Sequence, residues 1–162
     1  MSNGIALTHR GDWGLYAIID QQIWRPASGE PDKGIGVFTR LTATPSDRNL
    51  VDSYIDGGIV FAGMIPGRPD DVLSFSGYYA HVSNAARALS VDQIAFGNIG
   101  PLRTAERQLE INYQAQIMPG WQVDLDLQRV FSPGGGAANP ASPTGAGIPD
   151  ASIVTLHTQI KY

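Results

Sequence analysis

The chain has 162 residues, of which 43% are hydrophobic and 16% charged, so its composition is that of one folded domain rather than a disordered segment. Nineteen glycines and eleven prolines disfavour long helices, and the absence of cysteine excludes disulfide scaffolds, thiolate catalysis and cysteine-ligated zinc. The chain has a net charge of -4 and so lacks the excess of basic residues that is typical of nucleic-acid-binding proteins, and no nucleic-acid partner is expected.

Neither a membrane-spanning helix nor an export signal is predicted. No apolar run approaches the ~20 residues that a membrane-spanning helix needs. Residues 1–4 provide neither the basic nor the apolar region of a signal peptide. Two interpretations follow: a cytosolic protein, or a segment that lacks the front of a longer chain.

Four strands are predicted in the first half of the chain, because apolar and polar residues alternate along it. Their ranges are 13–24, 35–43, 53–61 and 72–82. In the first range Leu15, Ala17 and Ile19 alternate with Tyr16 and Asp20. Since successive side chains of a strand point to opposite faces, each range should have an apolar and a polar face, although the polar face is less decisive in the fourth.

A single helix is predicted, over residues 83–96. Ser83 or Asn84 can cap its first turn, and the alanines that follow favour helix. This helix therefore belongs to a long connection between two strands.

The clearest strand covers residues 108–117, where every odd position is apolar and every even position is polar. Pro119 and Gly120 then predict a tight turn into a strand over 121–128, which completes an antiparallel hairpin. The same alternation predicts a last strand over 151–162.

Alternating strands suit two environments. In a soluble barrel the apolar face points to a core, whereas in an outer-membrane barrel it points to lipid and the polar face lines a wet lumen. The predicted strands are as long as the ~9–11 residues that cross a bilayer. Strands of soluble proteins more often have ~5–6 residues, so strand length favours the membrane barrel.

Aromatic residues fall at the ends of the predicted strands, where the girdles of an outer-membrane barrel lie. These candidate interfacial aromatics are Trp13, Trp24, Trp121, Phe131 and Tyr162. Connection lengths favour the same environment. If the last strand ends on the periplasmic side, the long connections 83–102 and 132–149 are external and the tight turn at 119–120 is periplasmic. The short turn at 45–49 is an exception, because it would also be external.

Seven strands are predicted, whereas bacterial single-chain barrels have an even number of at least eight. Seven strands leave two open edges, and unpaired backbone groups are costly in lipid. The expected fold class is therefore an all-β, antiparallel transmembrane barrel of which this chain is the back part, cut in the loop that holds residues 1–12. This would also explain the missing export signal.

Short segments spread over nearly the whole chain carry a family pattern. They are Gly-Asp-Trp-Gly-Leu-Tyr-Ala at 11–17, Asp-Gln at 20–21, Trp-Arg at 24–25, Gly-Ile-Gly-Val-Phe-Thr-Arg at 34–40, Pro-Ser-Asp-Arg-Asn at 45–49, Ile-Pro-Gly-Arg-Pro-Asp-Asp at 65–71, residues 110–116 with Trp121, Phe-Ser-Pro-Gly-Gly-Gly at 131–136 and Ile-Pro-Asp-Ala at 148–151. In this order they resemble the C-terminal part of the OprB-type carbohydrate-selective porin family.

The resemblance implies a sixteen-stranded antiparallel barrel in the bacterial outer membrane that passes glucose and other small sugars by diffusion. Residues 1–162 would be the incomplete C-terminal part of this barrel domain and supply its last seven strands. The expected partners are the lipid bilayer, the missing N-terminal part of the barrel and the barrel-assembly machinery, because Tyr162 resembles the aromatic end that this machinery recognises. The family's constriction is partly built by loops of the absent part and is not placed on this sequence.

Lipopolysaccharide is a further expected partner. Arg87, Arg103 and Arg107 flank the helical connection, where contact with lipopolysaccharide phosphates is an alternative to ordinary solvation. Both possibilities stay open for these side chains.

A sugar pore needs no catalyst and no cofactor, but it needs a wide lumen with hydrogen-bonding groups that match hydroxyls. The candidate pore-lining residues are Asp20, Gln22, Arg40, Tyr54, Asp56, Gln108, Glu110, Asn112, Gln114, Asp124, Asp126 and Gln128. No catalytic residue is assigned. No metal site is assigned either, because His9, His81 and His157 lie far apart without metal-ligand spacing.

Two functions of other classes stay open. A soluble β-barrel that binds a small ligand would place the polar face outside. A carbohydrate-active enzyme would use Asp124 and Asp126, which lie on one strand face roughly 7 Å apart. That distance overlaps the carboxylate separation of inverting glycosidases, but a water-filled lumen would not push the two pKa values apart.

Overall fold

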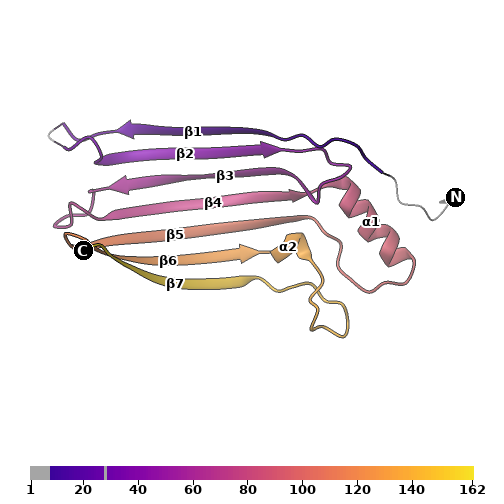
Figure 1. Ribbon diagram of the computed structural model, residues 1–162. Helices are drawn as coiled ribbons and strands as arrows, with labels where there is room; N and C mark the ends of the chain where they lie inside the picture. The colour runs from indigo at the N-terminus through magenta and orange to yellow at the C-terminus, as the bar shows by residue number, and fades with distance from the viewer. Residues whose placement is uncertain (1–7, 28) are drawn as a thin grey trace.

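The computed structural model describes residues 8–27 and 29–162, and this part of the chain forms seven strands and two short helices (Figure 1). The elements are β1 (Leu15–Trp24), β2 (Gly34–Ala43), β3 (Val51–Ala62), β4 (Val72–Val82), α1 (Asn84–Ala95), β5 (Ala105–Met118), β6 (Trp121–Phe131), α2 (Pro133–Gly136) and β7 (Ala151–Ile160). Neither helix is long and apolar enough to span a membrane. The expectation drawn from residues 1–4 lies outside the described residues.

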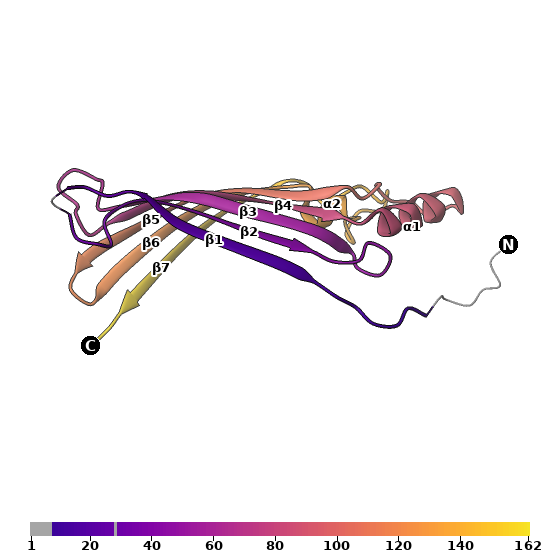
Figure 2. The same cartoon turned by 90° about the horizontal axis from the view of Figure 1, so that it is seen from above.

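All seven strands form one antiparallel sheet, in which their spatial order is their order along the chain. The sheet is a single twisted and curved layer (Figure 2). Strands β1 and β7 are its two edges, and within the described ranges neither pairs with a strand on its outer side. The prediction of a seven-stranded, all-β antiparallel sheet is confirmed.

The hairpin of β5 and β6 shows how the sequence sets the register. Gly120 adopts a φ of 84° in the two-residue turn, a conformation that glycine reaches without steric cost. Gln116 then lies opposite Gln122, and a bulge follows before Met118 meets Trp121. The tight turn predicted at this position is therefore present, and it fixes which side chains share a face.

Helix α1 begins where the sequence predicts a helix. The Ser83 hydroxyl accepts a hydrogen bond from the backbone N–H of Ala86 at 3.2 Å, so Ser83 is the N-cap. The Ser83 side chain is fully buried at the end of β4, and its backbone N–H donates to the carbonyl of Leu50 at 2.9 Å. Through Ser83, helix α1 is attached to the sheet.

Several element boundaries differ from the predictions, among them those of β1, β3, β5, β6 and β7. Strand β5 begins at Ala105 and strand β6 extends to Phe131, so both are longer than the alternation alone indicates. Strand β1 begins at Leu15, which leaves Trp13 just before it. Part of the predicted loop 132–149 is the short turn α2, where Gly134 and Gly135 take φ values of 66° and 70° that a regular helix does not have.

The register divides the side chains of the sheet between two faces. The polar face carries the even-numbered residues of β1–β6 and the odd-numbered residues of β7, and the apolar face carries the others, apart from shifts at the bulges. Leu109, Ile111 and Leu125 are examples of the apolar face, and all three side chains are exposed. The alternation in the sequence therefore becomes two chemically different surfaces of one layer.

The sheet does not enclose an apolar core. Among the described residues, the buried hydrophobic ones are Val82, Ala105 and Val130, which lie at the strand ends rather than in the middle of the sheet. Large apolar side chains are exposed along the apolar face of the sheet. A soluble β-barrel needs an enclosed core, and this arrangement does not supply one.

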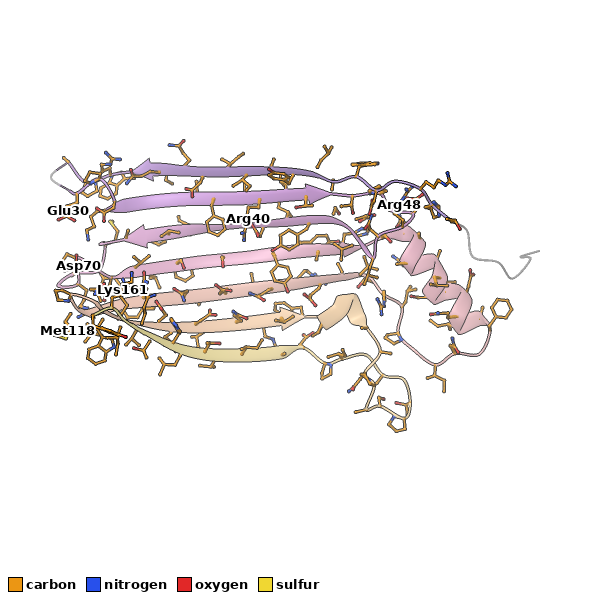
Figure 3. The ribbon with its side chains drawn as sticks, in the orientation of Figure 1. Glu30, Arg40, Arg48, Asp70, Met118 and Lys161 are labelled. Atoms are coloured by element: carbon orange, nitrogen blue, oxygen red, sulfur yellow. The ribbon has the colours of Figure 1, made fainter. Side chains whose placement is uncertain are left out.

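The two ends of the sheet differ. The loop end carries the connections 44–50, 83–104 and 132–150, with both helices, and the turn end carries the connections 25–33, 63–71 and 119–120. In Figure 3 Arg40 lies in the middle of the sheet, Arg48 at the loop end, and Glu30, Asp70, Met118 and Lys161 at the turn end. Trp13 and Phe131 lie at the loop end, whereas Trp24, Trp121 and Tyr162 lie at the turn end.

Candidate pore-lining face

The polar face brings together all the residues that the sequence predicts to line a pore. Their positions follow from six consecutive strand pairings. They are Asp20, Gln22, Arg40, Tyr54, Asp56, Gln108, Glu110, Asn112, Gln114, Asp124, Asp126 and Gln128. That this shared face lines a pore remains a prediction.

An ion pair lies at the centre of the face, between β2 and β3. Arg40 and Asp56 are directly opposite each other, and the Arg40 Nη2 atom lies 2.6 Å from the Asp56 Oδ2 atom. The Arg40 Nε atom also lies 2.9 Å from both carboxylate oxygens, and the Tyr54 hydroxyl donates to Asp56 Oδ2 at 2.9 Å. Asp56 is 6% exposed, so its charge is held by these donors rather than by water.

Two tyrosines extend this cluster toward β5. The rings of Tyr54 and Tyr78 lie 5.6 Å apart, and the Tyr78 hydroxyl is hydrogen-bonded to Glu106. Tyr78 and Glu106 are not among the predicted pore-lining residues. The signal was present, because Tyr78 continues the even-numbered series of β4 and Glu106 that of β5.

Amides and carboxylates form a row across β5, β6 and β7. Four side-chain pairs are hydrogen-bonded or in contact. These are Gln108 Nε2 to Glu110 Oε2 at 2.9 Å, Gln128 Nε2 to Asp126 Oδ2 at 2.6 Å, Gln122 Nε2 to Gln116 Oε1 at 2.8 Å, and His157 Nδ1 with Asp124 Oδ2 at 3.2 Å. Asp126 Oδ1 is buried and has no hydrogen-bond partner among the described residues. Oxygen and amide groups in such rows suit the hydroxyl groups of a neutral polyol.

The polar face also carries apolar side chains, among which Phe38 is predicted there by the alternation of residues 35–43 and Ile18 is not assigned to a face by the sequence. Ile18 lies opposite Arg40, and Phe38 lies opposite Asp20. A hollow of about 320 Å³ at β1–β3 is lined by Asp20, Gln22 and Phe38. A carboxylate, an amide and an aromatic ring therefore meet on one wall.

A second cluster holds the connection 63–71 to β5 at the turn end. Asp71 is 1% exposed and accepts hydrogen bonds from Arg68 Nε at 2.7 Å, from the backbone N–H of Gln116 at 2.9 Å and from the Tyr113 hydroxyl. Burial raises the pKa of Asp71, but these donors outweigh it, so the net pKa lies below its usual value.

Lys33 joins two neighbouring connections at the same end. Its ammonium donates to Asp70 Oδ1 at 2.9 Å and to the Pro69 carbonyl at 2.7 Å. The hydrogen bond to Asp70 raises the pKa of Lys33. Asp70 and Asp71 thus have different partners although they are adjacent in the sequence.

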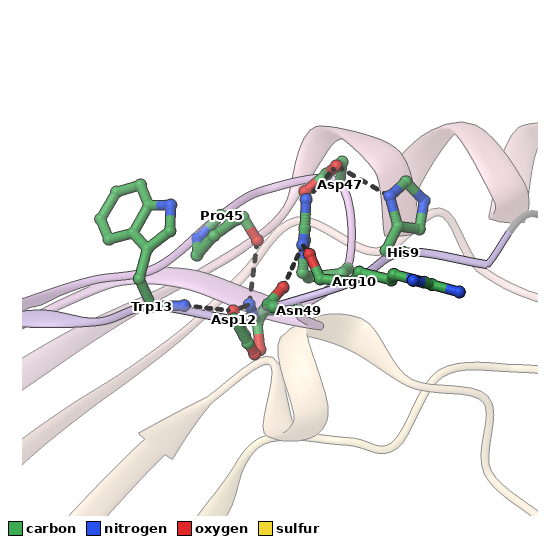
Figure 4. Close-up of polar contacts among 9 residues, drawn as sticks. His9, Arg10, Asp12, Trp13, Pro45, Asp47 and Asn49 are labelled. Atoms are coloured by element: carbon green, nitrogen blue, oxygen red, sulfur yellow. Dashed lines mark hydrogen bonds and ion pairs between the residues drawn. The ribbon is translucent and has the colours of Figure 1, made fainter.

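At the loop end, the segment before β1 is attached to the turn between β2 and β3 (Figure 4). His9 Nδ1 lies 3.2 Å from Asp47 Oδ2, and Asn49 Nδ2 donates to Asp12 Oδ1 at 3.1 Å. Arg48 donates to Asp47 and to the carbonyl of Gly11. The hydrogen bond from Arg48 lowers the pKa of Asp47, and the nearby His9 adds to the effect.

The described residues contain no group of three or more side chains placed to hold a metal ion. Asp124 and Asp126 share the polar face, but each is engaged with a neighbour, His157 and Gln128 respectively. The face therefore presents a set of hydrogen-bonding groups spread over six strand pairs rather than one compact catalytic cluster.

The comparison with known families decides what kind of protein carries this sheet. The model of the carbohydrate-selective porin family OprB matches residues 1–162. This chain belongs to the OprB family. The predicted family is confirmed.

Individual OprB relatives agree with this assignment. Porin B of Pseudomonas aeruginosa (strain PAO1) is 27% identical over 130 residues, which are 75% of this chain and 28% of that protein. The high-pH structure of Pseudomonas putida OprB superposes with a TM-score of 0.76 at 24% identity, over 94% of this chain and 36% of that one. The structural likeness shows the fold. The chain therefore spans 28% of one relative and 36% of the other.

Proposed function

We propose that this chain forms part of the wall of an outer-membrane pore through which glucose and other small carbohydrates diffuse passively. The observation that carries the proposal is the register of the sheet, which places the predicted lumen residues on one face and exposed apolar residues on the other. A barrel wall between lipid and water needs this division. Because the chain belongs to the carbohydrate-selective porin family, we propose carbohydrates as the solutes.

The polar face has the chemistry that passing sugars need. The amide and carboxylate rows of β5–β7 exchange hydrogen bonds with hydroxyl groups, and the rings of Phe38, Tyr54 and Tyr78 offer flat surfaces to the apolar faces of sugar rings. Since the protein moves no proton and breaks no bond in this function, Asp124 and Asp126 act as hydrogen-bonding groups and not as a catalytic pair.

The strands fit the thickness of a bilayer. Each has 10 to 14 residues, which covers the hydrocarbon region when the strand is tilted. We place the loop end outside the cell and the turn end in the periplasm, with Trp13 and Phe131 at the outer interface and Trp24, Trp121 and Tyr162 at the inner one. Tyr162 is then available to the barrel-assembly machinery, and lipopolysaccharide surrounds the loop end.

The open edges require further strands. Neighbouring strands alternate in direction, so β1 and β7 run the same way. Copies of this chain joined edge to edge would therefore meet in parallel, and pairing β1 with the β1 of an inverted copy would place the two loop ends on opposite sides of the membrane. We infer that residues 1–162 are an incomplete barrel domain and that an odd number of strands, nine in the sixteen-stranded barrel that the family resemblance implies, completes it.

A chimeric porin tests the proposal. Residues 1–162 replace the matching C-terminal part of Porin B, and glucose entry is followed by the swelling of liposomes. We expect the chimera to admit glucose and the 162-residue chain alone to admit none, because only the chimera closes. A folded, protease-resistant chimera that excludes glucose would contradict the proposed function. Rapid swelling with the chain alone would contradict the strand argument.

A further inference from the structure

Two arginines interrupt the apolar face. Apart from Asp52, which lies at the bulge of β3 and contacts His81, the described strand residues of this face include no lysine, aspartate or glutamate, but they include Arg107 on β5 and Arg129 on β6. Both lie near the loop end of their strands. A charged side chain on a lipid-facing surface is costly at the bilayer centre and nearly free at the interface, so both positions fit the interface.

Contacts direct Arg129 toward the loop end. Its Nη1 atom donates to the Ser152 hydroxyl at 2.9 Å, and its Nη2 atom lies 3.6 Å from Asp150 Oδ2. Its guanidinium carbon lies 5.6 Å from the centre of the Phe131 ring. Arg129 therefore extends along the face toward the interface, with Phe131 beneath its charge.

Arg107 has no such partners. It lies directly between Tyr79 of β4 and Phe131 of β6, and its exposed side chain forms no ion pair or hydrogen bond with any residue in the described ranges. The nearby acidic groups are engaged elsewhere: Glu106 with Tyr78 on the polar face, and Asp52 with His81 at 2.7 Å. One positive charge is thus uncompensated on this part of the face.

A groove of about 490 Å³ runs beside Arg107. Its lining includes Gly77, Tyr79, Arg107, Leu109, Phe131 and Asp150. Gly77 lies opposite Leu109 and has no side chain, and the Leu109 Cδ2 atom would lie 3.2 Å from a Cβ at this position, so Leu109 packs over Gly77 on the wall of the groove. Asp150 is held at the loop end, where its Oδ1 atom accepts the backbone N–H of Ser132 at 2.9 Å.

We propose that this groove binds one lipid that carries a phosphate monoester, with an acyl chain along Gly77 and Leu109 and the phosphate on Arg107, within reach of Arg129, which lies opposite Leu109 beside the groove. The two arginines and Asp150 leave one positive charge in excess, which complements an anionic headgroup. A guanidinium binds phosphate through two parallel hydrogen bonds, a geometry that a lysine does not offer. The occupant is a lipid because the groove opens on the apolar face, and this argument rests on the proposed function.

Lipid retention tests the site. The chimera of residues 1–162 with the N-terminal part of Porin B is placed in phosphatidylcholine nanodiscs that contain a minor fraction of phosphatidic acid, and native mass spectrometry counts the phosphatidic acid that stays bound. Loss of a charge-assisted contact is expected to weaken retention about tenfold in Arg107→Gln. Arg107→Lys should retain an intermediate amount, and Lys161→Gln at the turn end, outside the groove, should behave as the unsubstituted chimera.

Two controls separate the possible failures. Oleic acid replaces phosphatidic acid to supply a carboxylate of similar chain length, and equal retention of both lipids would overturn the proposed phosphate site. Because the chain has no cysteine, a fluorophore on Val154→Cys reports through quenching by brominated acyl chains whether the apolar face touches lipid. Quenching with unchanged retention in Arg107→Gln overturns the site alone, whereas absent quenching overturns the proposed function as well.

Discussion

Arg40 and Asp56 face each other across β2 and β3, with the Arg40 Nη2 atom 2.6 Å from the Asp56 Oδ2 atom, on a face that also carries amides, hydroxyls and further carboxylates. The carboxylate is buried and the guanidinium is more than half exposed. The ion pair therefore holds one side of the Arg40 guanidinium against Asp56, while the other side of the guanidinium remains accessible to a solute.

Substituting Asp56 tests the contribution of this pair to stability. Asp56→Asn removes the negative charge that accepts hydrogen bonds from Arg40 and Tyr54. The substitution should lower the free energy of unfolding by about 1–3 kcal/mol. Arg40→Ala should cost more than Asp56→Asn, because it leaves a buried carboxylate unpaired. Urea unfolding in detergent micelles measures both, and Ser76→Ala on the same face is the control. A greater loss in Asp56→Asn would contradict the assignment of the buried partner.

Asp71 predicts a loss of stability in acid. Its folded-state pKa lies below its usual value, so the stability that it contributes is complete above the unfolded pKa of about 3.9. That stability is lost as the pH falls through the lower, folded-state pKa. Asp71→Asn should cost about 1–3 kcal/mol at pH 7 and little at pH 2. Urea unfolding at the two pH values measures this, and an equal cost at both would contradict the lowered pKa.

Ser83 links helix α1 to the sheet by a cap that can be tested on its own. Ser83→Ala should destabilise the first turn of α1 by about 1 kcal/mol. Hydrogen exchange should then accelerate at the backbone amide of Ala86, while the amides in the middle of β3 keep their protection. Faster exchange throughout the sheet would show that Ser83 acts on the sheet instead.

Gly67 and Gly120 allow the cost of backbone strain to be measured apart from the cost of a steric clash. Gly67 and Gly120 both have positive φ values, 76° and 84°, but a Cβ atom at Gly67 would meet nothing within 4 Å. At Gly120 the same atom would lie 2.6 Å from the carbonyl oxygen of Lys161. Gly67→Ala should therefore cost only the left-handed strain of about 1–2 kcal/mol, and Gly120→Ala more. Equal unfolding free energies for the two variants would contradict the close approach of β7 to the turn.

The sequence predicted the strands and their two faces because strand alternation is a local property. The polarity of each residue in 108–117 indicates the face on which it lies. The strand pairings then align these residues with those of β4 and β6. The helix cap at Ser83 was predictable for the same reason. The alternation of residues 35–43 also predicted Phe38 on the face of Arg40. Ile18 could not be placed on the polar face from its polarity, since its face follows from the register with Arg40.

Contacts between residues that are distant in the sequence could not be predicted from the local alternation either. Asp71 and Tyr113 meet only because β4 and β5 are neighbours in a given register, and the sequence shows Arg68 alone as a nearby partner. The groove at Gly77 needs three strands and a loop to form. Such features follow from the assembled sheet rather than from any single segment.

Site-directed spin labelling tests the central claim, that the apolar face meets lipid and the polar face meets water, most directly. Single cysteines at Ile111 and Val123 on the apolar face, and at Gln114 and Asp124 on the polar face, carry the nitroxide in reconstituted bilayers. Labels on the apolar face should be relaxed by oxygen dissolved in the hydrocarbon, and labels on the polar face by a water-soluble nickel chelate. Labels at Ile111 and Val123 that respond to nickel, with those at Gln114 and Asp124 responding only to oxygen, would contradict the account.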